Sequence, residues 1–430
     1  MSTSRGIAIT TIGNVIPPVA ALVTQPILAQ GLGVIGRGEV AAATAPLLLA
    51  MAILTLGLPE SLTYHLARQF QAISRLTRMS IGALSIAGIA GSSAVALFAG
   101  PLSAGDDLLA QLITIAGLAI TPALIFAALR GLAAGSQRWT LIAVERIANG
   151  LLRLVAVLIL FMTGNLTPLT ATITIAITTF VAGIVYVSVL GTHRKINAPL
   201  SAPEERPRLF RYGVQVWLGA ATGMLLARLD QLLMTPLSSV EALGYYAVAV
   251  SISEVVLVFN SAVRDVMFAV ESRSPDAARV SSASRISTLL TVAAAAAIAT
   301  LCPWAIPFFF GSDFSAAVPV TLLLLVAIVL GNPGSVAGAA LSGRGRPGLR
   351  SASIAIAAAL NVIAVVLLVP SLGAVGAALA TLLGNVVAGT LNIVWLRTVF
   401  GARMRDFYSF RVSDVRDTYA LVVRLLRRSH

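Results

Sequence analysis

Four polar residues interrupt an apolar stretch, AVERIANGLLRLVAV, that covers residues 143–157. They are Glu145, Arg146, Asn149 and Arg153. A guanidinium stays charged and donates hydrogen bonds in a planar fork that matches the oxygens of a phosphate. On an α-helix, Arg146 and Arg153 lie within about 20° of each other and about 10 Å apart along the axis. The spacing therefore predicts one helix face that carries two phosphate-binding groups.

Two further apolar segments carry polar groups. Arg228, Asp230 and Gln231 lie in residues 212–235, and Glu254 lies in residues 244–263. Arg228 and Asp230 project to nearly opposite sides of a regular helix. An ionised side chain near the bilayer centre costs about 2.5–3.5 kcal/mol, so we expect these groups to face water, protein or a ligand.

These residues predict a water-filled cavity for an anionic substrate. Its expected ligands are Arg146, Arg153, Arg228, Asn149 and Gln231. The acids Glu145, Asp230 and Glu254 are expected to tune the arginines or to bind a coupling cation. In the structural alternative, the three acids pair with these arginines and lock the helix bundle.

The sequence does not favour metal, redox, nucleotide-binding or hydrolytic chemistry. Cys302 is the one cysteine and there are three histidines, which predicts no metal site and no redox chemistry. GLGVIG at 31–36 matches a dinucleotide motif by letter but follows an apolar helix rather than a strand. The single lysine forms no Walker motif, and no acidic pair has spacing suited to hydrolysis. We expect no cofactor and no enzymatic activity.

The elements that hold the polar residues are predicted to be membrane helices. The chain has 430 residues, of which 57% are hydrophobic and 11% are charged, whereas soluble domains carry about 25% charged residues. A membrane span needs about 20 mostly apolar residues. Twelve such segments occur: 7–28, 40–58, 79–99, 108–129, 139–162, 168–191, 212–235, 244–263, 286–310, 316–340, 351–369 and 374–396. The first has the outline of a signal peptide, but its length and two prolines favour a membrane helix.

The basic residues predict the orientation of these helices. The net charge of +13 does not indicate nucleic acid, because basic residues accumulate in cytoplasmic loops of membrane proteins. Nearly all of the 30 lysines and arginines fall in one alternate set of loops; the opposite set holds only Arg37. The sequence therefore predicts that both termini are cytoplasmic in a multi-pass protein of the plasma (inner) membrane.

A proline-rich polar segment at 192–211 divides the spans six and six. We predict an N-terminal lobe at 1–191, this cytoplasmic linker, and a C-terminal lobe at 212–396, related by a pseudo-two-fold axis along the membrane normal. In the basic tail, residues 397–430, Val415, Tyr419, Val422 and Leu426 have helical spacing. It is expected to form either an amphipathic interfacial helix or a partly disordered tail.

Weak internal similarity favours the two lobes. GRGEVAAATAPLLLA from Gly36 is similar to LGYYAVAVSISEVV from Leu243. GSQRWTL is similar to GRGRPGL, which pairs Gly135 with Gly343 and Arg138 with Arg346. The basic loop GRGRPGLR, residues 343–350, either holds an anionic group or follows the ordinary charge bias of cytoplasmic loops.

Together with the six-plus-six spans, two segments resemble a known family: LGVIGRGEVAAATAPLLLAMAILTLGLPESLTYHLAR, from residue 32, and SVEALGYYAVAVSISEVV, from residue 239. They are similar to the polysaccharide-biosynthesis (Wzx-type) flippases of the multidrug/oligosaccharidyl-lipid/polysaccharide exporter superfamily. The resemblance extends over about residues 5–397. It implies a V-shaped, two-lobed transporter that works by alternating access on an isoprenoid-pyrophosphate-linked saccharide. The superfamily's peptidoglycan-precursor flippases usually have two further spans.

The leading hypothesis is a flippase that moves a lipid-linked, anionic oligosaccharide from the inner to the outer leaflet without its own ATPase. The lipid bilayer and, as candidates, a polysaccharide polymerase or glycosyltransferases are its expected partners, and no nucleic acid is expected. The alternatives are a cation-coupled drug or metabolite antiporter of the same superfamily and an envelope-assembly scaffold. If transport requires the acids but not the arginines, the antiporter is favoured. If the protein still functions after all intramembrane charges are replaced, the scaffold is favoured.

Overall fold

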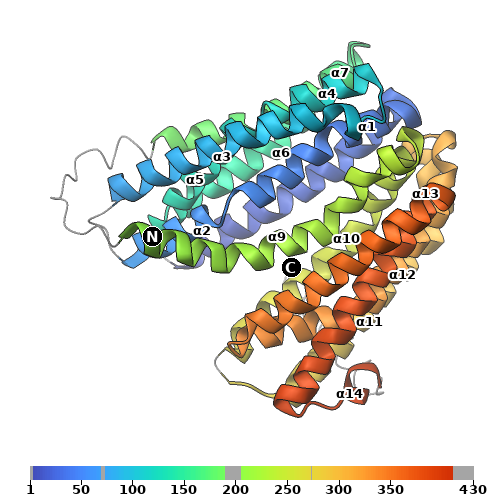
Figure 1. Ribbon diagram of the computed structural model, residues 1–430. Coiled ribbons are helices and arrows are strands. Elements are labelled where there is room, and N and C mark those ends of the chain that lie inside the picture. The colour runs from blue at the N-terminus through green and yellow to red at the C-terminus, as the bar shows by residue number, and fades with distance from the viewer. Residues whose placement is uncertain (1–2, 69–72, 189–204, 273, 410–430) are drawn as a thin grey trace. The chain divides into compact units, whose positions relative to one another are not determined.

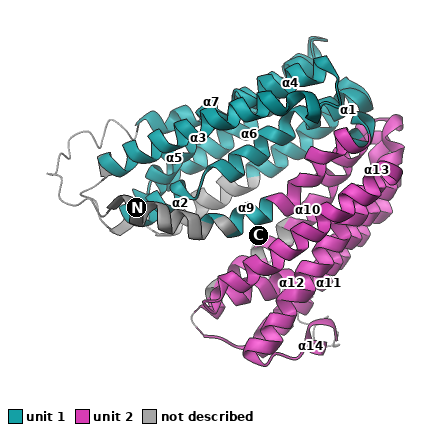
Figure 2. Ribbon diagram, in the orientation of Figure 1, with its two compact units in different colours: residues 1–224, 239–244 teal, residues 225–238, 245–430 magenta. Residues whose placement is uncertain are grey.

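The chain forms two compact helical units in the computed structural model, which describes residues 3–68, 73–188, 205–272 and 274–409. Unit 1 comprises residues 1–224 and 239–244, and unit 2 comprises residues 225–238 and 245–430 (Figure 2). The described residues contain helices and no strand (Figure 1). The elements are α1 (Thr3–Leu54), α2 (Leu58–Arg68), α3 (Ile73–Leu102), α4 (Asp107–Gly117), α5 (Ile120–Gly135), α6 (Trp139–Met162), α7 (Pro168–Val181), η2 (Ala182–Tyr186), α9 (Glu205–Leu237), α10 (Val240–Glu271), α11 (Ala277–Phe310), η3 (Ser312–Ala316), α12 (Ala317–Gly343), α13 (Pro347–Phe400) and α14 (Arg405–Tyr408).

The two longest elements, α1 and α13, each contain two helical arms joined at a glycine. Gly33 has φ 66° and Gly373 has φ 54°, values that suit glycine because it lacks a Cβ. At the first break the chain reverses, since Arg37 donates a 2.7 Å hydrogen bond to Gln25 (Figure 1). A continuous helix would separate these two residues by about 18 Å. Each element therefore holds two of the predicted spans.

Helix lengths and composition confirm the all-α, polytopic membrane fold. Eight stretches of the described chain are long and apolar enough to cross a membrane; one, Ile16–Leu66, covers most of α1 together with α2, and another is α13. The charged helix α6, at Trp139–Met162, has the bounds predicted for the fifth span, and α9 covers the seventh. The cytoplasmic orientation of the termini and the predicted lobe boundaries stay predictions. Residues 192–204 of the linker lie outside the described part.

Helix α2 is an element that the span analysis did not predict. Its eleven residues are too short to cross a bilayer, and they fall in a segment expected to be a loop. Leu58, Leu62 and Leu66 recur at a spacing of four and are fully buried. They pack in the main hydrophobic cluster of unit 1 with Leu124 and Leu132 of α5. The apolar face of this amphipathic helix therefore packs against α5 in unit 1.

GSQRWTL and GRGRPGL, which are similar in sequence, form the same kind of turn. In the first turn, the backbone N–H of Arg138 donates to the carbonyl of Ala133, and in the second Arg346 donates to Leu341, both at 2.9 Å. The residue before each arginine is left-handed, with φ 55° at Gln137 and φ 75° at Gly345. The same backbone path therefore starts α6 and α13.

Two glycines allow a close reciprocal helix crossing within unit 1. A Cβ added at Gly38 of α1 would overlap the carbonyl oxygen of Val240 of α10. Conversely, a Cβ at Gly244 would overlap the carbonyl oxygen of Val34. Each glycine thus lies against the carbonyl four residues before the other glycine. The crossing depends on the absence of side chains at both positions, which lie in the two segments that resemble each other.

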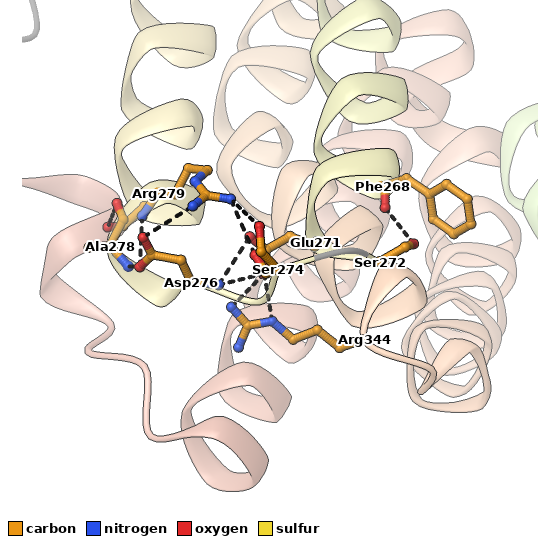
Figure 3. Close-up of polar contacts among 9 residues, drawn as sticks. Phe268, Glu271, Ser272, Ser274, Asp276, Ala278, Arg279 and Arg344 are labelled. Carbon is orange, nitrogen blue, oxygen red and sulfur yellow. Dashed lines mark hydrogen bonds and ion pairs between the residues drawn. The ribbon is translucent and has the colours of Figure 1, made fainter.

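In unit 2, a buried ion pair joins the α10–α11 connection to the start of the α12–α13 turn (Figure 3). Arg344 contacts Glu271 at 2.7 Å, and their side chains are 5% and 0% exposed. The guanidinium of Arg344 also lies over the ring of Phe400, 4.9 Å from its centroid. Glu271 additionally accepts the backbone N–H of Asp276, at 3.3 and 3.2 Å from its two oxygens. Part of the basic loop GRGRPGLR is therefore structural.

The chain after α13 packs against unit 2 over a short distance. Arg285 of α11 donates a 2.6 Å hydrogen bond to the carbonyl of Asp406 in α14, and Phe407 is buried in the adjacent hydrophobic cluster. The predicted amphipathic pattern of the tail, at Val415, Tyr419, Val422 and Leu426, lies outside the described residues.

The reciprocal crossing predicts a strong effect of small substitutions. We expect Gly38→Val and Gly244→Val each to lower the free energy of unfolding by about 3 kcal/mol, because backbone atoms must separate to admit a side chain. Gly82→Val is the matched control, since a Cβ at this helical glycine of α3 meets nothing within 4 Å. Thermal unfolding in detergent compares the three. Equal melting temperatures would contradict the close crossing.

Candidate functional site

The carboxylate of Glu145 lies in a polar cluster inside unit 1. Glu145 is 3% exposed, and its Oε1 accepts a 2.8 Å bond from Arg130 of α5. Its Oε2 accepts a 3.2 Å hydrogen bond from the hydroxyl of Tyr186 in η2. Arg130, assigned to a loop by the span analysis, is therefore a helical residue and the ion-pair partner of Glu145. The structural alternative named the wrong arginines for this acid.

The rest of the polar stripe on α6 is directed to α7 or to the helix surface. Asn149 donates a 2.9 Å hydrogen bond to the backbone carbonyl of Thr178. The Nε of Arg153 lies 3.4 Å from the hydroxyl of the same threonine. Arg153 and Asn149 are half-buried, and Arg146 is exposed. Thus Arg153, deep in an apolar helix, has a neutral partner rather than an acid.

Unit 2 contains a buried carboxylate with neutral hydrogen-bond partners. Asp230 of α9 is 2% exposed. Its Oδ2 accepts hydrogen bonds from the hydroxyls of Tyr246 in α10 and Thr381 in α13, the latter at 3.1 Å. Its Oδ1 accepts the backbone N–H of Gln231 at 2.7 Å. Because burial of an ionised carboxylate is costly, a proton or a bound cation would stabilise this arrangement.

On the same pair of helices, Arg228 of α9 forms an ion pair with Glu254 of α10 at 3.0 Å. The two side chains are 27% and 44% exposed, so this pair is more accessible than Asp230. Gln231 is 7% exposed. The ion pair expected by the structural alternative therefore forms for Glu254, whereas Asp230 forms none among the described residues.

The predicted site residues fall into separate clusters in two units. Glu145, Asn149 and Arg153 lie in unit 1, as does Arg146; the others, Arg228, Asp230, Gln231 and Glu254, lie in unit 2. A single cavity lined by all of them stays a prediction. Helical spacing predicted which polar side chains share a helix face, but it did not predict which residues of other helices they contact. Sequence reasoning missed Arg130, Thr178, Tyr186, Tyr246 and Thr381, of which only Arg130 carries a charge that could have indicated a partner.

The structure also bears on metal binding and on the dinucleotide motif GLGVIG. Within the described ranges, no group of three or more histidine, cysteine or acidic side chains could hold a metal ion. GLGVIG lies across the break at Gly33, where two helical arms of α1 meet, and not between a strand and a helix. That arrangement lacks the strand that a dinucleotide-binding turn requires.

Residues 3–273 match the family model described as polysaccharide biosynthesis protein. The fold is similar to an inward-facing multidrug resistance MATE family transporter of the MOP superfamily, with TM-score 0.75, 15% identity, and 91% and 98% of the two chains covered. It is also similar to the lipid II flippase MurJ in an inward closed conformation, with TM-score 0.76, 12% identity, and 96% and 92% covered.

A MOP superfamily transporter from Pyrococcus furiosus aligns with TM-score 0.59 and 15% identity over 91% of this chain and 98% of its own; its binding pocket is described as having reverse polarity. In sequence, an uncharacterized membrane protein of Methanocaldococcus jannaschii is 26% identical over 196 residues. This match covers 44% of the chain and only 39% of that relative's length.

The Glu145 cluster predicts a structural role that stability measurements can test. We expect Glu145→Gln to lower the free energy of unfolding by about 2 kcal/mol, since it breaks a buried ion pair whose arginine is 44% exposed. Glu254→Gln breaks a more exposed pair and is expected to cost at most about 1 kcal/mol. Thermal unfolding of both variants gives the comparison. An unchanged melting temperature for Glu145→Gln would argue against the structural role.

Proposed function

The chain belongs to the polysaccharide biosynthesis protein family, and we propose that it moves a lipid-linked oligosaccharide across the plasma membrane. The proposed cargo is a saccharide on an isoprenoid pyrophosphate, carried from the inner to the outer leaflet by alternating access. In this role the protein is a transporter and not an enzyme. The lipid-linked saccharide and the bilayer are its proposed partners, with a polysaccharide polymerase or glycosyltransferases acting beside it.

The observation that carries this proposal is the uncompensated charge of Arg153. Among the described residues, its hydrogen bond is to the hydroxyl of Thr178, and no acid forms an ion pair with it. Elsewhere on α6, Glu145 is already paired with Arg130. An arginine kept in an apolar helix without an acid is suited to an anionic ligand, because the guanidinium donates to phosphate oxygens while it remains charged.

Arg146 and Arg228 are the other two proposed ligands of the pyrophosphate. Arg146 lies on the same predicted face of α6, two turns from Arg153, and is exposed. Arg228 is accessible but paired with Glu254, so a phosphate must compete with that carboxylate. Asn149 and Gln231 are proposed to add neutral hydrogen bonds to the headgroup or its sugar.

Asp230 is proposed to couple transport to a cation, of which a proton is the simplest. The carboxylate is buried among hydroxyls and lacks an ion pair in the described structure, so loss of its proton leaves a charge that favours rearrangement. This observation also favours the second candidate function, a cation-coupled antiporter for drugs or metabolites. The two functions differ in whether the arginines are needed: the flippase requires them to bind phosphate, whereas the antiporter does not.

We expect Arg153→Gln to reduce flipping of a lipid-linked oligosaccharide about tenfold or more, which is the loss expected for a charge-assisted hydrogen bond. Reconstituted vesicles report the fraction of a fluorescent lipid-linked saccharide that reaches the outer leaflet. Arg279→Gln, which breaks an exposed ion pair with Asp276, is the control and is expected to retain transport. Full flipping by Arg153→Gln would refute the ligand role. If the protein were a scaffold, neither the unmodified protein nor the variants would flip the lipid-linked saccharide.

Asp230→Asn keeps a side chain of the same size but cannot release a proton. We expect this variant to fold, since Tyr246 and Thr381 can still donate to the amide oxygen, and to lose any acceleration of transport by a pH gradient. Flipping with and without the gradient measures the effect. A gradient response equal to that of the unmodified protein would exclude Asp230 as the coupling group. Cation-driven drug efflux that survives Arg153→Gln would favour the antiporter.

A further inference from the structure

The basic loop GRGRPGLR contains three arginines in three different environments. Arg344 is buried and paired with Glu271 (Figure 3). Arg346 is exposed at the N-cap of α13 and makes no side-chain cap hydrogen bond. Arg350 is half-buried one turn further along the helix. The loop is therefore more than a uniform positive surface, and the third arginine needs a separate explanation.

Arg350 and Arg264 of α10 start from the same part of unit 2, because Leu349 and Val263, the residues before them, pack against one hydrophobic cluster. Their positive charges repel each other. Both side chains are half-buried. Among the described residues, neither guanidinium forms an ion pair or a hydrogen bond, and the Nε of Arg264 is buried with no partner. Two half-buried guanidiniums thus lie in the same part of unit 2, and no acid of the described chain forms an ion pair with either.

The packing around Arg350 holds its side chain in this region. Gly338 of α12 lacks a side chain, and a Cβ built there would lie 3.4 Å from the Cδ of Arg350 and 2.7 Å from the Nδ2 of Asn392. Trp395 and Val263, the residue before Arg264, both pack against the hydrophobic cluster that contains Phe407, and the indole N–H of Trp395 is buried without a partner. The region therefore contains unused donors as well as two charges.

The position of Arg350 in its helix adds to the electrostatic imbalance. It lies in the first turn of the arm that starts at Pro347, and that turn contains no acidic residue. The N-terminal end of a helix carries partial positive charge and favours anions over cations. An arginine placed there next to a second arginine is unfavourable unless a negative group is present.

We propose that Arg264 and Arg350 form a binding site for the phosphate group of an anionic ligand, separate from the arginines of α6 and α9. Two guanidinium forks can surround a phosphate and donate to several of its oxygens at once. The source is either the headgroup of an anionic phospholipid or a free phosphate. Because the loop is predicted to be cytoplasmic, a lipid source would lie in the inner leaflet. The site does not depend on the transported cargo.

The test measures the melting temperature of the full-length chain in nanodiscs. One series replaces phosphatidylcholine stepwise with phosphatidylglycerol, and a second adds inorganic phosphate to phosphatidylcholine discs. We expect the anion to raise the melting temperature of the unmodified protein, because a ligand stabilises the state that binds it. Arg264→Gln and Arg350→Gln should weaken the apparent affinity about tenfold or more.

The exposed Arg346→Gln removes one charge from the same loop and is the matched control. We expect it to respond like the unmodified protein. Retained response in both Arg264→Gln and Arg350→Gln, or an equal loss in Arg346→Gln, would overturn the proposal. A response to inorganic phosphate supports a free ion as the source, and a response confined to phosphatidylglycerol supports a lipid headgroup.

A second measurement separates binding from a structural role. In pure phosphatidylcholine without phosphate, Arg264→Gln and Arg350→Gln should melt at or above the temperature of the unmodified protein, because each substitution removes the repulsion between like charges. If both variants melt lower under these conditions, the arginines contribute to folding through contacts of their own, and the anion site is refuted.

Discussion

The bilayer core offers no water to polar groups, so each charge within it must find its partner inside the protein or in a ligand. This constraint explains why so few charged residues interrupt the apolar helices and why most of them are joined to another helix. Glu145 links α6 to α5 and η2, and Asp230 links α9 to α10 and α13. Each unit thus contains a buried acid that joins three of its helical elements.

The two units satisfy their buried acids in different ways. Glu145 is balanced by the positive charge of Arg130. Asp230 is surrounded by hydroxyls and needs a proton or a cation to be neutral. A charge that is already compensated holds the fold together, whereas one that is not can respond to a ligand. This distinction separates Glu145 from Asp230 and Arg153, whereas Arg228, also assigned to transport, is paired with Glu254.

Much of the fold could be predicted from the sequence, because a membrane span depends on apolar length alone. The bounds of α6 and the similarity of the turns at Arg138 and Arg346 follow from local sequence. The amphipathic helix α2 was missed, since eleven residues give no span signal. For the candidate site, helical spacing predicted which polar side chains share a face. It did not predict Arg130 as the partner of Glu145, because that contact depends on how helices pack.

The two residues whose hydroxyls bind Asp230 lie at very different distances from it along the sequence, so they are synthesised at different times. Tyr246 follows it by 16 residues, but Thr381 follows by 151 and belongs to α13, the last element of the described chain that is long enough to span. During translation, α9 must therefore enter the membrane with its acid satisfied only in part. The carboxylate acquires its second hydroxyl when α13 inserts. A chain arrested before α13 therefore retains the hydrogen bond of Asp230 to Tyr246 but lacks the one to Thr381.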